Sequence, residues 1–135
     1  MRFLDTNVLL YSVSGKSGEE EKRSIAQALL LHEDCVLSVQ VLQEFYVQAT
    51  RPSRPDALSH RIATAFVEGW MRFRIQDVTV PILRHALDLK ERHRFSYWDC
   101  TIVSAAWATG CDALYSEDLS HGQVIEGVRI VNPFG

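Results

Sequence analysis

Acidic residues recur where predicted strands end or helices begin, and four of them stand next to apolar residues. These four are Asp5, Glu44, Asp99 and Asp118. At an effective dielectric constant of about 20, two carboxylates about 4 Å apart repel each other by about 4 kcal/mol. If the four converge, they need a cation or an altered protonation state. Because only oxygen ligands are at hand, a hard ion, Mg²⁺ or Mn²⁺, is favoured.

Such a site would activate water for attack on a phosphodiester. A divalent ion lowers the pKa of its bound water and stabilises charge on the leaving oxygen. No Ser–His–Asp or Cys–His pattern and no G-x-x-x-x-G-K-[ST] phosphate loop competes with this interpretation. Taken singly, each acid also has a structural interpretation. Asp5 and Asp99 suit helix capping, whereas Glu44 suits a solvated helix face.

The elements that must position these acids follow from the apolar pattern. Short apolar runs alternate with longer segments of helical periodicity, which is typical of an α/β domain. The predicted strands are residues 2–4, 35–37, 74–78, 113–115 and 128–131. Because helical segments join them, we predict one domain over residues 1–135 with a mostly parallel sheet. Functional residues collect at the carboxyl ends of the strands in such sheets.

The two helices after residue 78 begin with clear capping residues, Thr79 and Ser96. Helical periodicity predicts that Leu83 and Leu87 face the core from the first of them. It predicts the same for Trp107 in the second helix.

The charge of the chain is unevenly distributed. Fourteen Lys and Arg stand against seventeen Asp and Glu, giving a net charge of −3 and a pI near 5.9. This balance argues against nucleic-acid binding through bulk positive charge. The segment 51–94 nevertheless has nine basic and five acidic residues, so its net charge is +4. A local basic face is therefore compatible with the sequence.

The cysteines and the apolar runs bear on the compartment. Cys35, Cys100 and Cys111 are an odd number without a C-x-x-C pair, so we expect packed free thiols. No apolar run reaches about 18 residues, and the first residues lack a signal-peptide pattern. We therefore expect a cytoplasmic protein without a membrane segment.

The ordered acidic motifs carry a family resemblance. Leu4-Asp5-Thr6-Asn7, a helical Glu44, Tyr97-Trp98-Asp99 and Ser116-Glu117-Asp118-Leu119 resemble the motifs of PIN-domain nucleases. The closing residues 115–134 are similar to those of bacterial VapC toxins. The resemblance implies a five-stranded parallel sheet of order 3-2-1-4-5, flanked by helices. It also implies an endoribonuclease that depends on Mg²⁺ or Mn²⁺.

The resemblance also implies roles for individual residues. Asp5 and Asp99 would bind the metal, and Glu44 would bind it directly or through water. Asp118 would complete the acidic pocket, although Glu117 is an alternative fourth acid. The residues that would orient these carboxylates are Thr6, Asn7, Ser116 and Glu117.

Partners follow from the same resemblance. We expect an RNA substrate, a small antitoxin whose tail covers the acidic pocket and inserts an arginine, and a homodimer. The arginines expected to contact RNA are Arg51, Arg54, Arg92 and Arg94. The alternative is a non-catalytic module that binds RNA or protein on the same fold. A receiver-type phosphotransfer domain is disfavoured because no lysine follows Lys90. The RNA sequence, a DNA substrate and the number of metal ions stay open.

Overall fold

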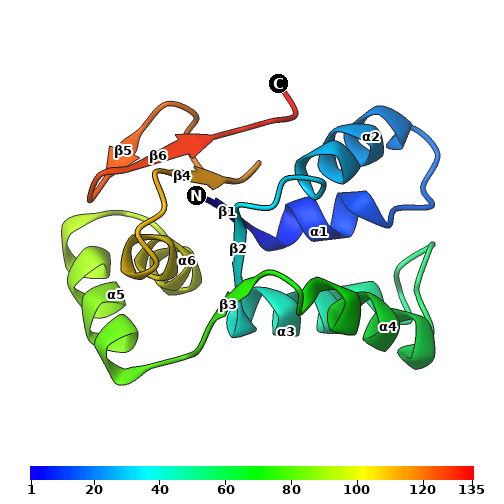
Figure 1. Ribbon diagram of the computed structural model, residues 1–135, viewed down its shortest axis with the longest axis horizontal. Coiled ribbons are helices and arrows are strands. Elements are labelled where there is room, and N and C mark those ends of the chain that lie inside the picture. Colours follow the sequence, from blue (N-terminus) through cyan, green and yellow to red (C-terminus); the bar gives the residue numbers. More distant parts are fainter.

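Six strands form a single sheet in the computed structural model, which describes residues 1–135 (Figure 1). The strands are β1 (Arg2–Leu4), β2 (Cys35–Ser38), β3 (Arg74–Gln76), β4 (Ala113–Tyr115), β5 (Val124–Ile125) and β6 (Val128–Val131). Their order is β3-β2-β1-β4-β6-β5. All neighbouring strands are parallel except β5 and β6. The predicted α/β fold and the order 3-2-1-4-5 are confirmed, with β6 as the fifth strand.

The sheet has six strands rather than the predicted five, because β5 adds a short antiparallel edge. β5 and β6 are joined through Glu126 and Gly127, whose φ angles are 52° and 80°. Positive φ at both positions is what a tight two-residue hairpin requires. Glutamate is not a residue typical of such a turn, so the sequence contained no clear signal for a hairpin.

Six helices flank the sheet. They are α1 (Thr6–Ser12), α2 (Glu20–Leu29), α3 (Val39–Ala49), α4 (His60–Trp70), α5 (Val80–Arg92) and α6 (Tyr97–Ala108). α5 and α6 lie on one side of the sheet, and α1 to α4 lie on the other (Figure 1). The predicted caps are present: the Thr79 hydroxyl accepts from the Ile82 N–H, and the Ser96 hydroxyl accepts from the Asp99 N–H. None of these helices has both the length and the apolar character required to traverse a bilayer.

The core lies between the sheet and both helix layers, where Phe3, Leu37, Leu114 and Ile130 are fully buried. The three cysteines are also buried as free thiols.

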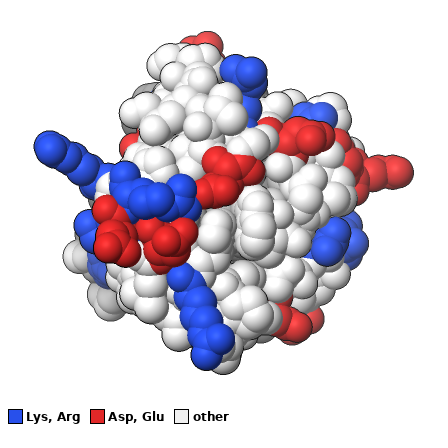
Figure 2. Space-filling view, turned by 90° about the vertical axis from the view of Figure 1, so that its left-hand side faces the viewer, with Lys and Arg blue, Asp and Glu red and all other residues white.

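The predicted inward positions of Leu83, Leu87 and Trp107 are wrong. Their exposed fractions are 43%, 53% and 47%. The apolar stripe of α5 is wider than the face it buries, because Ile82 and Ala86 already fill the contact with the rest of the protein. Figure 2 looks onto the side of the molecule where α5 lies, and broad areas of that face carry no charged side chain.

Candidate active site

The parallel register of β1 and β4 brings two predicted site residues side by side. Leu4 pairs with Tyr115, so the next residues, Asp5 and Ser116, leave the same edge of the sheet together. The Asp5 N–H donates to the Tyr115 carbonyl at 3.0 Å. The Ser116 hydroxyl donates to Asp5 Oδ2 at 2.8 Å. The strand register therefore places a hydroxyl donor on this carboxylate.

Asp5 is a buried carboxylate, with an exposed fraction of 5%. Its other oxygen, Oδ1, accepts the Thr6 N–H at 2.7 Å at the start of α1. Burial raises the pKa of Asp5 to about 6, and this effect outweighs the two hydrogen bonds, which lower it. The charges of Asp118 and Glu44 raise the pKa further. Asp5 is thus both a helix cap and an acid whose charge no basic side chain of the protein offsets.

Glu44 is tied to the same centre through α1. The Thr6 hydroxyl donates to Glu44 Oε2 at 2.8 Å. On the other oxygen, the amide of Gln40, one turn earlier in α3, donates to Oε1 at 2.9 Å. Glu44 is half-buried and held in place, so it does not lie on a solvated helix face.

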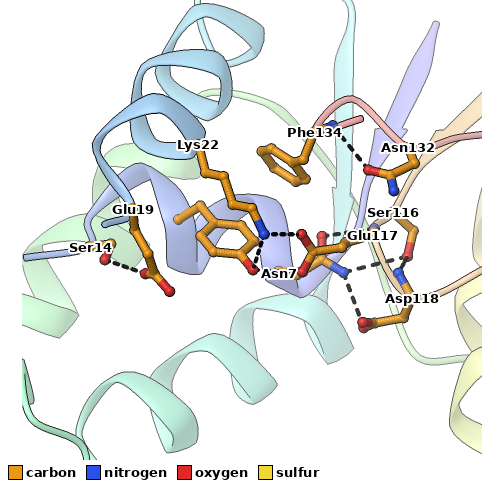
Figure 3. Close-up of polar contacts among 10 residues, drawn as sticks. Asn7, Ser14, Glu19, Lys22, Ser116, Glu117, Asp118, Asn132 and Phe134 are labelled. Carbon is orange, nitrogen blue, oxygen red and sulfur yellow. Dashed lines mark hydrogen bonds and ion pairs between the residues drawn. The ribbon is translucent and has the colours of Figure 1, made fainter. Parts of the chain in front are cut away.

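Asp118 is the exposed acid of the group, and Asn7 holds it (Figure 3). The Asn7 amide donates to Asp118 Oδ2 at 3.1 Å. The Asp118 N–H donates to the Ser116 hydroxyl at 3.2 Å, and this hydroxyl is the one that donates to Asp5. Ser116 is completely buried, and it links the acid after β1 to the acid after β4.

Asp99 comes from the first turn of α6 and is half-buried. Burial raises its pKa, the hydrogen bond with Ser96 lowers it, and the charges of Asp118 and Glu44 raise it again. The charges of the same two carboxylates therefore act on both Asp5 and Asp99. The four acids predicted from the sequence share one electrostatic site, formed by β1, α3, α6 and the residues after β4.

The donor set fits a hard divalent cation. Burial is the main cause that raises the pKa values of Asp5 and Asp99, and the charges of Glu44 and Asp118 raise both further, so a bound cation would offset an unfavourable charge. No three Asp, Glu, His or Cys side chains lie close enough to bind one ion directly. Mg²⁺ suits this spacing, because it keeps several water molecules and uses few direct protein ligands.

Glu117 has different contacts from Asp118, although the two are neighbours (Figure 3). Tyr11 of α1 donates to Glu117 Oε1, and Lys22 of α2 donates to Oε2, both at 2.6 Å. Burial acts to raise the pKa of Glu117, but these two hydrogen bonds outweigh it and hold the pKa below its ordinary value. The Tyr11 ring also packs edge-on against Phe134, with ring centroids 4.8 Å apart. Both Glu117 oxygens are occupied within the chain.

The predicted RNA-contacting arginines lie in different environments. Arg51 lies beside Glu44, lining the same hollow. Arg54 forms an ion pair with Asp56 at 2.9 Å, and Arg92 forms ion pairs with Asp88 and Glu126 at 2.8 and 2.6 Å. Arg94 is exposed. The RNA contacts stay predictions, and Arg51 is the arginine placed beside the acids.

Sequence reasoning did not identify Lys22 and Gln40 as residues that contact the acids of the site. Lys22 lies in the charged run 19–23, where nothing distinguishes it from a solvated lysine. Its partner Glu117 is 95 residues away, so the contact exists only after α2 has packed on α1. The (i, i+4) spacing of Gln40 and Glu44 was the one available signal.

Comparison with known proteins agrees with the resemblance seen in the sequence. The family model of the PIN domain matches residues 2–125. A comparison with curated protein sequences gave no match.

Several solved structures share the fold. The Mycobacterium tuberculosis toxin VapC20, described as cleaving the sarcin–ricin loop, is 21% identical with a TM-score of 0.70, over 87% of this chain and 90% of that chain. A toxin–antitoxin complex from Klebsiella pneumoniae is 18% identical with a TM-score of 0.73, over 98% of both chains. FitAcB from Neisseria gonorrhoeae is 17% identical with a TM-score of 0.73, over 99% of both chains.

Proposed function

Because the chain belongs to the PIN domain family, we propose that it is a metal-dependent endoribonuclease and the toxin of a toxin–antitoxin pair. The family match confirms the resemblance found in the sequence. The observation that carries the proposal is the convergence of Asp5, Glu44, Asp99 and Asp118 on one site at the carboxyl edge of the sheet. The VapC20 toxin, which has the same fold, is described as cleaving the sarcin–ricin loop, and because that loop is an RNA element, this supports the choice of RNA.

The proposed cofactor is Mg²⁺ or Mn²⁺, the kind of ion that PIN nucleases generally use. When bound, it would lower the pKa of a water molecule and stabilise the leaving oxygen. Asp5 and Asp99 would bind the ion, Glu44 would bind it through water, and Asp118 would complete the acidic pocket. Thr6 and Asn7 would orient Glu44 and Asp118, and Ser116 would orient Asp5.

The test is RNA cleavage by Asp5→Asn and Asp99→Asn proteins in Mg²⁺. Each substitution keeps the size of the side chain but removes its charge, so we expect at least a 100-fold loss of cleavage with an unchanged circular dichroism spectrum. Asp112→Asn is the matched control, since Asp112 is an exposed acid at the opposite end of β4. Cleavage by Asp5→Asn at the parent rate would exclude the proposal.

A non-catalytic RNA- or protein-binding module is the second candidate. It has no use for four neighbouring carboxylates, so the added effect of the Glu44 and Asp118 charges on both Asp5 and Asp99 counts against it. Calorimetric titration separates the two candidates. Heat of Mg²⁺ binding at millimolar concentration supports the nuclease, and its absence supports the binding module.

We include a small antitoxin in the proposal. Two structures of the same fold are a toxin–antitoxin complex and FitAcB, and their chains match this one over almost their whole length. The acidic pocket offers a counter-charge for an arginine on the partner's tail. A short reading frame next to this gene, whose product co-purifies with the chain and inhibits cleavage, is the expected result.

We also propose a cytoplasmic homodimer. Val80, Leu83 and Leu87 are exposed along one face of α5 and form an apolar stripe that a second copy would cover. Buried free thiols at all three cysteines fit a reducing compartment.

A further inference from the structure

A hollow of about 490 Å³ has Glu44 of the acidic site in its lining, and it lies between α3 and the start of α6. Five of its lining residues bear on ligand chemistry: Gln40, Gln43, Gln48, Arg51 and Trp98. Glu44 belongs both to this lining and to the acidic site. A molecule in the hollow would therefore lie next to the atoms proposed to act on a phosphodiester.

Trp98 is the unusual feature of the hollow, because 64% of its surface is exposed. It precedes Asp99 in the first turn of α6, and its backbone carbonyl accepts a bond from the Gln40 amide at 3.4 Å. Its packing on Tyr97 is edge-on, with ring centroids 5.2 Å apart. An exposed indole at an acidic site suits stacking, since every nucleobase has a face that can stack on an aromatic ring.

The polar residues around Trp98 suit the edge of a base. The Gln43 and Gln48 amides form no side-chain hydrogen bond within the chain, so their donors and acceptors are free. A neutral base can approach the acidic residues without the repulsion that a phosphate would meet. Arg51, which has no carboxylate partner, lies at the same hollow and can hold the adjoining phosphate.

We propose that this hollow binds one unstacked base of single-stranded RNA beside the scissile phosphate. Trp98 stacks on the base, Gln43 and Gln48 contact its edge, and Arg51 binds the backbone. The inference rests on the proposed nuclease function and adds a binding subsite to it. Only Val47 and Trp98 among the seven lining residues are apolar, so the lining favours a nucleotide over an apolar protein surface.

The experiment compares Trp98→Ala with Trp107→Ala, since both are exposed tryptophans of α6 and Trp107 lies outside the hollow. Affinity for a labelled single-stranded RNA is measured by fluorescence anisotropy in EDTA, which prevents cleavage. A second probe has the same length and an abasic ribose–phosphate backbone. We expect Trp98→Ala to weaken RNA binding about 10-fold and leave abasic binding unchanged. Trp107→Ala should change neither, and Trp98→Phe should restore part of the affinity.

Three outcomes overturn the subsite. If Trp98→Ala binds both probes as tightly as the parent does, or lowers the affinity for both equally, Trp98 does not stack on a base. If light scattering shows that Trp98→Ala dissociates a dimer, a second copy covers Trp98 instead. Cleavage of RNA by the parent in Mg²⁺ is measured alongside. If the parent cleaves RNA and any of these three results is found, the subsite alone is rejected. If the parent neither cleaves nor binds RNA, the nuclease function is rejected as well.

Discussion

At the scale of single residues, Asp5 shows how one side chain serves both the fold and the site. It caps α1 through the Thr6 N–H, and it accepts the Ser116 hydroxyl on its other oxygen. These bonds hold the carboxylate in place, whereas burial and the neighbouring acids make its charge unfavourable. A position that costs stability without a cation is typical of a functional site.

The pH dependence of stability should reveal this cost. The pKa of Asp5 is about 6 in the folded protein, against an ordinary 3.8, so the folded state binds the proton more tightly. Stability is therefore lost as pH rises from about 4 to above 6, by up to about 3 kcal/mol from this group. In urea unfolding without metal, the free energy of unfolding of Asp5→Asn should therefore increase relative to that of the parent as the pH rises across this range. Asp112→Asn should follow the parent, and an equal slope in Asp5→Asn would contradict the assignment.

The neighbouring acids Glu117 and Asp118 should respond differently to loss of charge. Glu117 has both oxygens engaged by Tyr11 and Lys22, while Asp118 is bound by the Asn7 amide and acts electrostatically on Asp5 and Asp99. We expect Asp118→Asn to lower Mg²⁺-dependent cleavage at least 10-fold. Glu117→Gln should retain cleavage within a few-fold. If Glu117→Gln lowered the rate of cleavage more than Asp118→Asn did, Glu117 would be the fourth acid of the site.

At the scale of elements, strand register and helix packing bring the acids together. β1 and β4 are neighbours in the sheet, although more than 100 residues separate them in the chain. α3 carries Glu44 to Thr6 because it packs beside α1. α2 holds the segment after β4 in place through the contact of Lys22 with Glu117 (Figure 3).

This contact predicts that Lys22 is a positioning residue. Lys22→Met leaves a carboxylate oxygen of Glu117 without its cation, so the segment 116–118 should become more mobile and Asp118 less well placed. We expect a several-fold fall in kcat at saturating RNA, larger at limiting Mg²⁺. Lys90→Met, at an exposed lysine of α5, is the control. An unchanged Mg²⁺ dependence in Lys22→Met would show that the contact serves stability alone.

At the scale of the whole molecule, the acidic site and the exposed apolar stripe of α5 lie on different elements. The acids that matter converge at one edge of the sheet, so the net charge of −3 says little about RNA binding. α5 carries exposed apolar side chains, and this helix lies on the side of the molecule that Figure 2 shows. Such a stripe is expected at a contact between protein molecules.

The oligomeric state tests this expectation. Leu83→Glu puts a charge into the middle of the α5 stripe, so it should convert a dimer into a monomer in light-scattering measurements. Leu31→Glu is the matched control, because Leu31 is an 83% exposed leucine outside the stripe and should leave the dimer intact. A dimer that survives Leu83→Glu would show that this face of α5 is not the interface.

The apolar pattern of the sequence determined the fold class and the positions of the five principal strands, and the family resemblance implied their order; the four acids remain a prediction from their places at strand and helix ends. Apolar periodicity and capping residues are local signals, and the ends of parallel strands meet at one edge for any such sheet. Only the tertiary structure decided which of Glu117 and Asp118 has its oxygens engaged, that Leu83 and Leu87 face outward, and that Trp98 lines a hollow beside Glu44. These features depend on contacts between residues far apart in the chain, such as Lys22 with Glu117. Such contacts arise from packing, and no local pattern encodes them.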